Sequence, residues 1–352
     1  MTILVTGAAG FIGSNFVLDW LDQSKEGVVS LDLLTYAGNL ENLSFLNNNP
    51  LQHFVQGDIG DRDLVSSLLK KYQIRAVLNF AAESHVDRSI HESKNFIGTN
   101  IVGTYNLLES ARSYWNDLDP NLKKDFRFLH ISSDEVYGSL SSSDHPSNEN
   151  DPYKPNSPYS ASKAASNHLV RSWFQTYNLP ALTVNSANNY GPYQFPEKLI
   201  PLCILNALKG KPLPIYGDGQ QIRDWLYVKD HCTAIREILI NGQIGETYNV
   251  GGWNEKTNLK VVETLCAILD ELKPKSDGKS YSDQITFVKD RPGHDRRYAI
   301  DASKLESELY WKPQETFETG LGKTVLWYIE NETWMKHVVS GEYYHWIQKQ
   351  YS

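Results

Sequence analysis

Short apolar runs of strand length alternate with helical patterns through the first 190 residues, and this alternation restricts the chain to a small set of folds. A strict strand–helix rhythm predicts a parallel sheet that is covered by helices on both faces. We therefore expect an α/β fold built on a doubly wound parallel sheet. The strands are expected at residues 3–5, 28–31, 53–55, 76–80, 126–131 and 181–185, and the helices at 11–21, 64–72, 95–111 and 159–177.

A glycine-rich segment, TGAAGFIG, joins the first expected strand to the first expected helix. Gly7, Gly10 and Gly13 allow a sharp turn and a close approach of the backbone to a pyrophosphate, which then faces the helix N-terminus. Asp32 closes the second strand, and a carboxylate there accepts hydrogen bonds from both ribose hydroxyls and repels a 2′-phosphate. The spacing of the glycines alone is only moderately specific. Together with Asp32 it predicts a Rossmann-type site for NAD rather than NADP.

The rhythm breaks after about residue 190, where a loop rich in Pro, Gly and aromatic residues begins. We expect a smaller C-terminal α/β lobe that binds the substrate, with part of the chain returning to the main sheet. In this division residues 1–190, with returning segments near 224–250, form the NAD-binding domain, and residues 191–223 and 251–352 form the lobe. The tail from Trp327 to Tyr351 is rich in Trp and Tyr, which favours a packed C-terminal helix.

The composition argues against several classes of protein. The 34 basic and 42 acidic residues give a formal net charge of −8, whereas sequence-independent nucleic-acid binding requires a basic surface. No apolar run approaches the roughly 18 residues of a membrane span, and the N-terminus shows no signal-peptide pattern. The three cysteines lie too far apart for a disulfide framework or a zinc site. We expect a cytoplasmic protein that holds no metal.

Tyr159 and Lys163 stand four residues apart at the start of an expected helix, so they share one helix face. An unperturbed tyrosine has a pKa of about 10 and is a poor base at neutral pH. A neighbouring ammonium and a nicotinamide cation both favour the phenolate, so we expect them to lower the pKa of Tyr159. The pair would then remove the proton of an alcohol that also loses a hydride.

Two adjacent acids follow a hydroxyl at the end of the fifth expected strand, in the order Ser133, Asp134, Glu135. Ligands of doubly wound sheets bind beyond the carboxyl ends of the strands, so this segment should face the nicotinamide. Crowded like charges in an apolar site push one pKa upward, which provides an acid and a base side by side. A solvated Asp-Glu turn is the alternative, and the position after this strand favours chemistry.

Segments along nearly the whole chain resemble the dTDP-glucose 4,6-dehydratases, a branch of the extended short-chain dehydrogenase/reductase family. They include TGAAGFIGSNF, NFAAESHVDRSI, SSDEVYG, YSASKAASNHLV, NNYGPYQFPEKLIPL, PIYGDGQQIRDWLYVKDH and DRPGHDRRYAID. Ser133 stands where this family usually has Thr, and it keeps the hydroxyl. The resemblance implies oxidation of dTDP-glucose at carbon 4 with NAD, elimination of water across carbons 5 and 6, and hydride return to carbon 6, giving dTDP-4-keto-6-deoxyglucose for deoxysugar biosynthesis such as that of dTDP-rhamnose.

The resemblance also implies contacts and an assembly. NAD would stay tightly bound and be regenerated in each turnover, and two copies of the chain would pair through a four-helix interface made by the helices at 95–111 and 159–177. The implied NAD contacts are Gly7, Gly10, Phe11, Ile12, Gly13, Asp32, Leu33, Leu34, Thr35, Asp58, Ile59, Phe80, Ala81, Ala82, Ser84, Thr99, Tyr159, Lys163 and Asn189. The implied nucleotide-sugar contacts are Ser84, Ser133, Asp134, Glu135, Asn188, Glu197, Lys198, Leu199, Pro214, Tyr216, Arg223, Asn258, Asp290, Arg291, His294 and Tyr298.

Two other functions fit parts of the pattern. A nucleotide-sugar 4-epimerase, or a dehydratase that acts on another nucleoside-diphosphate hexose, would use the same NAD site and the same Tyr159–Lys163 pair. An epimerase has no need of Asp134 and Glu135, so these acids favour a dehydratase. A non-catalytic redox sensor would not need the intact set of catalytic side chains.

Overall fold

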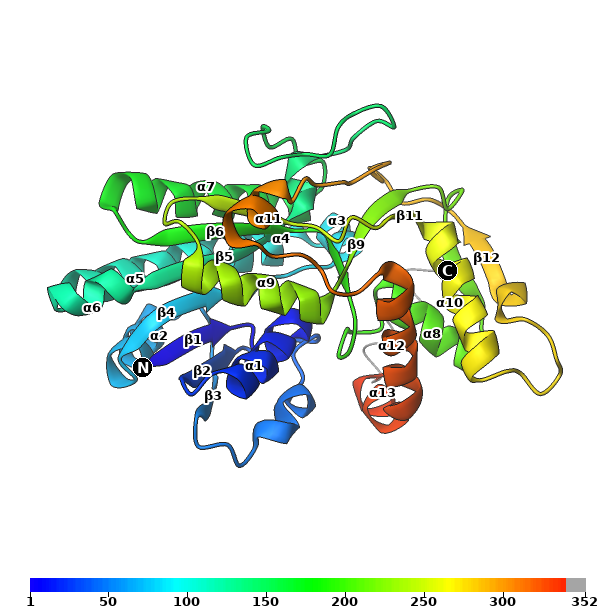
Figure 1. Ribbon diagram of the computed structural model, residues 1–352, viewed down its shortest axis with the longest axis horizontal. Coiled ribbons are helices and arrows are strands. Elements are labelled where there is room, and N and C mark those ends of the chain that lie inside the picture. The colour runs from blue at the N-terminus through cyan, green and yellow to red at the C-terminus, as the bar shows by residue number, and fades with distance from the viewer. Residues whose placement is uncertain (340–352) are drawn as a thin grey trace.

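The computed structural model describes residues 1–339, and its centre is a seven-stranded sheet (Figure 1). All neighbouring strands of this sheet run parallel, which confirms the doubly wound α/β prediction. In spatial order the strands are β10 (Thr247–Val250), β6 (Ala181–Ser186), β5 (Arg127–Ser133), β4 (Ile74–Asn79), β1 (Thr2–Thr6), β2 (Gly27–Asp32) and β3 (Gln52–Gln56).

The order of the strands reverses between β1 and β4. The chain runs outward from β1 to β2 and β3, and then crosses to the other side of β1 to build β4, β5 and β6. Loops that leave the carboxyl ends of β1 and β4 therefore separate and open a crevice, where ligands of such sheets bind. The fold thus brings the glycine-rich turn after β1 and the segment after β4 to opposite sides of one cleft.

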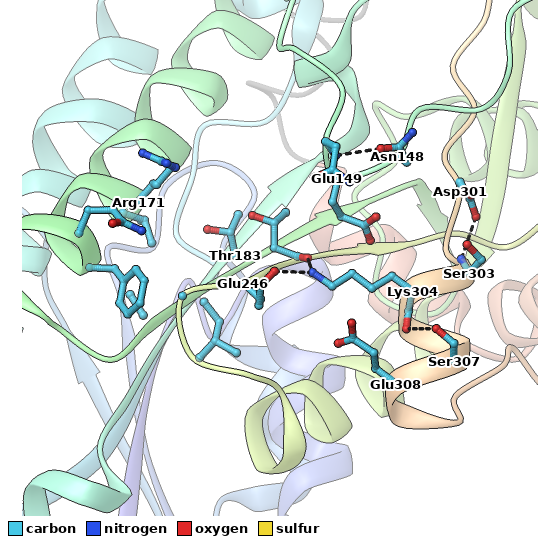
Figure 2. A pocket seen from close by; sticks show the side chains of 18 residues that line it. Asn148, Glu149, Arg171, Thr183, Glu246, Asp301, Ser303, Lys304, Ser307 and Glu308 are labelled. Carbon is cyan, nitrogen blue, oxygen red and sulfur yellow. Dashed lines mark hydrogen bonds and ion pairs between the residues drawn. The ribbon is translucent and has the colours of Figure 1, made fainter.

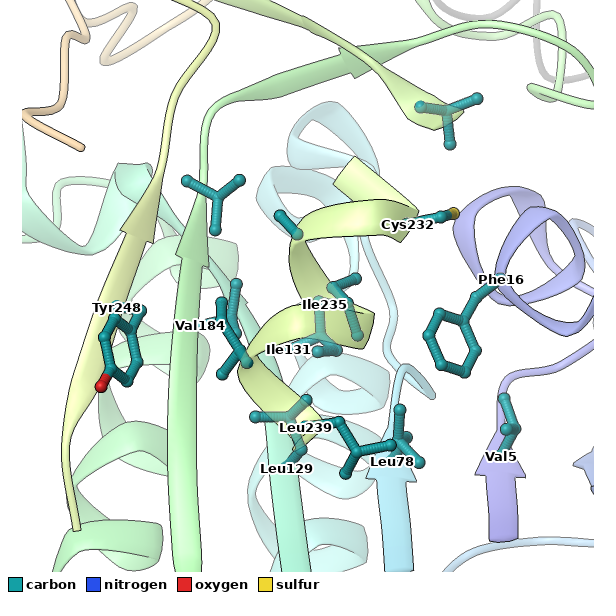
Figure 3. Packing of buried hydrophobic residues seen from close by; sticks show 14 of the residues in the cluster. Val5, Phe16, Leu78, Leu129, Ile131, Val184, Cys232, Ile235, Leu239 and Tyr248 are labelled. Carbon is teal, nitrogen blue, oxygen red and sulfur yellow. The ribbon is translucent and has the colours of Figure 1, made fainter. Parts of the chain in front are cut away.

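Alternating side chains of the buried strands feed two separate cores, because successive residues of a strand point to opposite faces. Ile3 and Val5 pack in the core under α1 (Phe11–Gln23) and α9 (Val228–Asn241), which Figure 3 shows with Phe16, Ile235 and Leu239. Leu4 lies in the other core. The helices on that face are α2 (Arg62–Lys71), α5 (Thr104–Asp117) and α7 (Pro158–Tyr177).

The expected helix over residues 95–111 is confirmed, since the chain is helical from Ser93 to Asp117, but it contains a π-helical stretch that was not expected. The structure divides it into α4 (Ser93–Phe96), a π-helical stretch η2 (Ile97–Gly103) and α5. Asn100 lies in the π-helical turn, and its side chain donates to the Glu83 carbonyl at 3.0 Å and accepts from the Glu83 amide at 2.9 Å. This tertiary contact favours a widened turn at Asn100. Such π-helical turns are frequent at functional sites.

A second core lies beside the carboxyl ends of the large sheet, at the right of Figure 1. It packs around a three-stranded sheet, β11-β9-β7, and a parallel pair, β8 with β12. Its elements are β7 (Asn188–Tyr190), α8 (Leu199–Leu208), β8 (Leu213–Tyr216), β9 (Ile222–Tyr227), β11 (Glu255–Thr257), α10 (Asn258–Leu272), β12 (Ile285–Val288), α12 (Phe317–Glu330) and α13 (Glu332–Val338).

Short helical segments complete the described chain: η1 (Leu40–Leu46), α3 (Val86–His91), α6 (Pro120–Asp125), η3 (Asp134–Tyr137), η4 (Tyr281–Gln284) and α11 (Ser303–Leu309). In residues 1–339, no helix is long and apolar enough to cross a membrane. The aromatic tail is helical from Trp327 into α13, while its part from residue 340 onward lies outside the described residues.

Candidate active site

The glycine-rich turn is shaped so that only glycine fits at two of its positions. Gly7 has φ +64°, and a Cβ on it would lie 2.7 Å from the backbone nitrogen of Ala81. A Cβ on Gly13 would lie 2.2 Å from the Gly7 carbonyl oxygen. Gly10, which precedes α1, offers no side chain to cap the helix. The first amide groups of α1 are therefore left facing the cleft, as binding of a pyrophosphate requires.

Asp32 braces this turn against the end of β2. Its Oδ2 accepts a hydrogen bond from the Ala9 amide at 2.9 Å, and its Oδ1 accepts one from the Leu34 amide at 2.8 Å. Burial raises the pKa of this carboxyl, while the backbone hydrogen bonds lower it. Leu34 itself has φ +57°, a conformation that turns the chain sharply away from the strand.

A cleft runs from the glycine-rich turn to the segment before α8, and most of the expected NAD contacts line it. The cleft also takes in residues that the sequence patterns did not indicate: Leu31, Ala37, Gly38, Gly57, Glu83, Ile131, Gln194 and Phe195. The expected NAD contacts in its lining are Gly7, Gly10, Phe11, Ile12, Gly13, Asp32, Leu33, Thr35, Asp58, Ile59, Phe80, Ala81, Ala82, Ser84 and Thr99. Leu34, Tyr159, Lys163 and Asn189 do not line it.

Ser133 organises the expected catalytic segment. It is the last residue of β5, and its hydroxyl oxygen accepts from the Glu135 amide at 3.2 Å as the N-cap of η3. The same hydroxyl lies 3.3 Å from Asp134 Oδ1 and is hydrogen-bonded to Tyr159. The strand end therefore holds the two acids and the phenol around one side chain.

Asp134 is buried and Glu135 is half-buried, and each has one buried oxygen that no described residue satisfies, Asp134 Oδ2 and Glu135 Oε2. Burial, followed by repulsion from Glu135, raises the pKa of Asp134 well above its usual range. Burial also raises the pKa of Glu135, while the charges of Arg291, Arg223 and Lys198 lower it. Asp134 is thus suited to donate a proton and Glu135 to accept one.

Burial shifts the pKa values of both Tyr159 and Lys163. Burial, and next the Glu135 carboxyl, raises the pKa of Tyr159, whereas its bond to Ser133 lowers it. Lys163 donates from Nζ to the Ile131 carbonyl at 2.7 Å, and burial lowers its pKa to about 7. Desolvation of the phenolate is the largest influence on the Tyr159 pKa, and the Lys163 ammonium is not among the influences on it. The expected lowering, which also depends on a nicotinamide cation, stays a prediction.

Cations gather on the substrate side of the cleft, close enough for their charges to act on Glu135. Arg223 is buried, donates to the Asp295 carbonyl at 3.0 Å and has its guanidinium carbon 4.3 Å from the centroid of the Tyr298 ring. Arg291 forms an ion pair of 3.4 Å with Asp87. An acidic chain therefore presents a local basic group where a diphosphate can be held.

Other expected sugar contacts surround this group. Tyr216 donates to Asp87 Oδ2 at 3.3 Å, and His294 Nδ1 lies 2.6 Å from Asp290 Oδ1. Within residues 1–339, Asn188 Oδ1 and Asn189 Oδ1 are buried without a hydrogen-bond partner, as side chains that await a ligand would be. The remaining expected sugar contacts lie on several elements: Ser84 after β4, Glu197 and Lys198 before α8, Leu199 at the start of α8, Pro214 on β8 and Asn258 at the start of α10. The described hydrogen bonds and ion pairs do not link Leu199, Pro214 or Asn258 to the group of cations.

Sequence reasoning missed three residues that support the site. Asp87 pairs with Arg291, Asn100 holds the segment after β4, and Arg88 forms an ion pair of 3.0 Å with Glu197. Asp87 and Arg88 belong to the segment HVDRSI, where an acidic and a basic residue are adjacent in the sequence. These adjacent charges could have indicated a functional position. No periodic pattern, however, predicts whether the two side chains face the site.

A second hollow, of about 780 Å³, lies at the sheet edge around β6, β10 and α11 (Figure 2). Its lining is polar and includes Glu149, Glu246, Glu308 and Lys304, of which Lys304 donates to Glu246 at 2.7 Å. The described residues that line it include none of the expected catalytic or ligand-contacting ones. The other cleft is lined by most of the expected NAD contacts, although by none of the expected catalytic residues, so we place the candidate site at the carboxyl ends of the strands, where Ser133 ends β5.

Comparison with known proteins agrees with this geometry. Residues 4–324 match the family model described as GDP-mannose 4,6 dehydratase. A dTDP-glucose 4,6-dehydratase of Xanthomonas campestris is 59% identical over 342 residues, which cover 97% of each chain. A solved dTDP-glucose 4,6-dehydratase of Bacillus anthracis, in complex with NAD, superposes with a TM-score of 0.85 at 44% identity over 96% of this chain and 99% of that one. The enzyme of the same name from Streptomyces venezuelae, also with NAD bound, gives 0.86 at 43% identity over 96% and 100%.

Proposed function

Because this chain belongs to the GDP-mannose 4,6-dehydratase family and matches dTDP-glucose 4,6-dehydratases over its length, we propose that it is an NAD-dependent hydro-lyase acting on dTDP-glucose. It converts this substrate to dTDP-4-keto-6-deoxyglucose. The single observation that carries the proposal is the adjacent pair Asp134 and Glu135, each with one buried oxygen that lacks a hydrogen-bond partner among the described residues, beside Tyr159. An epimerase on the same scaffold needs Tyr159 but has no step for two such acids.

The residues of the cleft fit NAD. The glycine-rich turn leaves no space for a Cβ at Gly7 or Gly13, and the open N-terminus of α1 suits a pyrophosphate. Asp32 stands where ribose hydroxyls can donate to a carboxylate. When bound, NAD supplies an acceptor for the hydride of carbon 4 and later the donor of the hydride that carbon 6 receives.

Tyr159 removes the proton of the 4-hydroxyl as this carbon is oxidised. Burial raises its pKa, and a positive charge in the adjoining cleft would favour the phenolate. Ser133, bonded to Tyr159, holds the phenol at the strand end and can donate to the oxygen that becomes a ketone. Lys163, anchored on Ile131, stands one turn further along the same helix.

Glu135 then removes the proton of carbon 5, which the ketone at carbon 4 has made acidic. Asp134, protonated because of its raised pKa, gives its proton to the departing 6-hydroxyl, and water leaves. Glu135 returns its proton to carbon 5 when carbon 6 is reduced. Each such acid or base contributes roughly 10² to 10⁴ in rate.

The division of the chain follows from this assignment. We propose that residues 1–190 with 224–250 hold the cofactor, and that residues 191–223 and 251–352, of which 340–352 lie outside the described part, hold the nucleotide sugar. The separate cores around the seven-stranded sheet and around α8, α10 and α12 support two parts, but not at these bounds. Trp225 and Tyr227 of β9 pack in the second core, whereas Ile300, Leu305 and Trp311 pack in the core of the seven-stranded sheet. Arg223 and Arg291 of the second part bind the diphosphate.

We further propose a homodimer. Large apolar side chains are exposed along η2, α5 and α7: Ile97 at 52%, Val102 at 49%, Tyr105 at 39% and Tyr177 at 42%. These helices lie next to one another, so a second copy could cover them with its own pair. Sedimentation should give a dimer, and Val102→Lys should shift it toward a monomer.

The three buried free cysteines favour a reducing compartment, and we propose the cytoplasm.

The test of the function is a comparison of dTDP-glucose with UDP-glucose, in which formation of the 4-keto-6-deoxy sugar is followed. We expect conversion of dTDP-glucose with no net consumption of NAD. With deuterium at carbon 4, the label should reach the methyl group at carbon 6 of the product. Loss of the label to solvent, or stoichiometric use of NAD, would contradict the proposal. Faster conversion of UDP-glucose than of dTDP-glucose would show that the preferred nucleotide base is uracil and not thymine.

A further inference from the structure

Loop 33–39 and the segment 195–198 form two facing parts of the cofactor cleft. Thr35, Ala37 and Gly38 line it from the loop, and Phe195, Glu197 and Lys198 line it from the segment before α8. The loop follows Asp32, and the segment leads into the second core. Both parts therefore border the space in which the cofactor is proposed to bind.

The side chain of Tyr36 joins these two parts. Its hydroxyl donates to Glu197 Oε1 at 3.0 Å, and its ring packs edge-on against Phe195 with 5.7 Å between centroids. Arg88 completes the contact: its Nε donates to Glu197 Oε2 at 3.0 Å, and its guanidinium carbon lies 3.6 Å from the centre of the Tyr36 ring. Both oxygens of Glu197 are thus engaged, one by each partner.

The backbone bonds of the loop run to its own side of the cleft. The Gly38 amide donates to the Thr35 carbonyl at 3.0 Å, and the Asn39 amide donates to the Ala9 carbonyl at 3.0 Å. The Tyr36–Glu197 hydrogen bond, in contrast, crosses to the other part. It is a charge-assisted bond to a carboxylate that is 5% exposed, so water competes with it poorly.

We propose that Tyr36 is a clasp that holds the cofactor cleft closed, and that opening of the Tyr36–Glu197 contact limits the release of NAD. This inference rests on the proposed function, in which the same cofactor must remain bound from the oxidation to the reduction. Tyr36 is a positioning residue here, since it acts on the cofactor through the closure of loop 33–39 and not through the reacting atoms.

The test uses Tyr36→Phe, which keeps the ring stacked on Arg88 and removes only the hydroxyl. The matched control is Tyr310→Phe, because Tyr310 is 90% exposed. Protein loaded with radiolabelled NAD is chased with unlabelled NAD, and retained label is counted after rapid desalting. Loss of a hydrogen bond to a charged group predicts dissociation about 10- to 100-fold faster than in wild type or the control.

A purely structural role would not produce the same pattern. With saturating NAD, Tyr36→Phe should keep kcat within about twofold of wild type, while dilution without added NAD should inactivate it. The chase is run at a temperature at which wild type, the variant and the control are all folded, because loss of a buried hydrogen bond also lowers stability. A rate of NAD dissociation from Tyr36→Phe within twofold of wild type would overturn the clasp, whatever the turnover rate. The chase contains no sugar, so failure of the clasp is distinguished from failure of wild type to convert dTDP-glucose.

Discussion

Lys163 Nζ donates a hydrogen bond of 2.7 Å to the backbone carbonyl of Ile131, and this contact ties helix α7 to strand β5 two residues before the catalytic hydroxyl. The ammonium is 3% exposed, so burial acts on its charge at full strength and lowers its pKa to about 7. The first prediction follows from this buried charge.

In the NAD-free protein, stability should rise with pH above 7 relative to Lys163→Met. Between pH 7 and about 10.5 the unfolded chain keeps the proton that folded Lys163 has released, so the free energy of unfolding increases with pH. The expected relative gain between pH 7 and pH 9 is about 2 kcal/mol. Urea unfolding at both pH values measures it. Exposed Lys25→Met is the control and should follow wild type; a flat difference would contradict the lowered pKa.

Glu135→Gln should leave the first oxidation intact and stop the elimination. An amide cannot take the proton from carbon 5, so turnover should fall by about 10² to 10⁴. Reduced cofactor should accumulate and be visible by its absorbance. Glu149→Gln is a matched control, since burial also raises the pKa of Glu149 but its side chain lines the distant hollow. Normal turnover of Glu135→Gln would remove Glu135 from the mechanism.

Asp134→Asn should slow the departure of the 6-hydroxyl by a similar factor, because the raised pKa makes Asp134 the proton donor. Glu135 is still present in this variant, so the proton at carbon 5 should exchange with deuterated solvent while water is retained. Glu135→Gln should show neither exchange nor elimination. The two variants therefore separate the roles, and exchange that is absent in Asp134→Asn would show that the acids act as one unit.

Gly13→Ala should weaken NAD binding by about 100-fold or more, because its Cβ would lie 2.2 Å from the Gly7 carbonyl and the turn would have to move. Titration calorimetry with NAD measures the effect. Gly98→Ala is the matched control, since a Cβ there meets no heavy atom within 4 Å. Equal affinity of both variants would show that the turn can relax without loss of the cofactor.

The sequence predicted secondary structure correctly where it depends on residues that are close together in the chain. The strands around Ile3 and Val28, the glycine-rich turn and the helix from Pro158 were expected within a few residues of their observed bounds, because burial on two faces and helix spacing are written into consecutive residues. The helix through Asn100 was also expected, but its π-helical turn was not, since a contact with Glu83 after β4 favours that turn and no local pattern specifies it.

The sequence by itself determined the sheet, the chemistry after β5 and the identity of the groups that can donate or accept protons. Only the tertiary structure decided their states and partners. Desolvation, which depends on every element that covers a side chain, raises the pKa of Tyr159 and lowers that of Lys163 to about 7. The contact of Tyr36 with Glu197 joins positions 161 residues apart, and no pattern along a chain specifies a pairing at that separation.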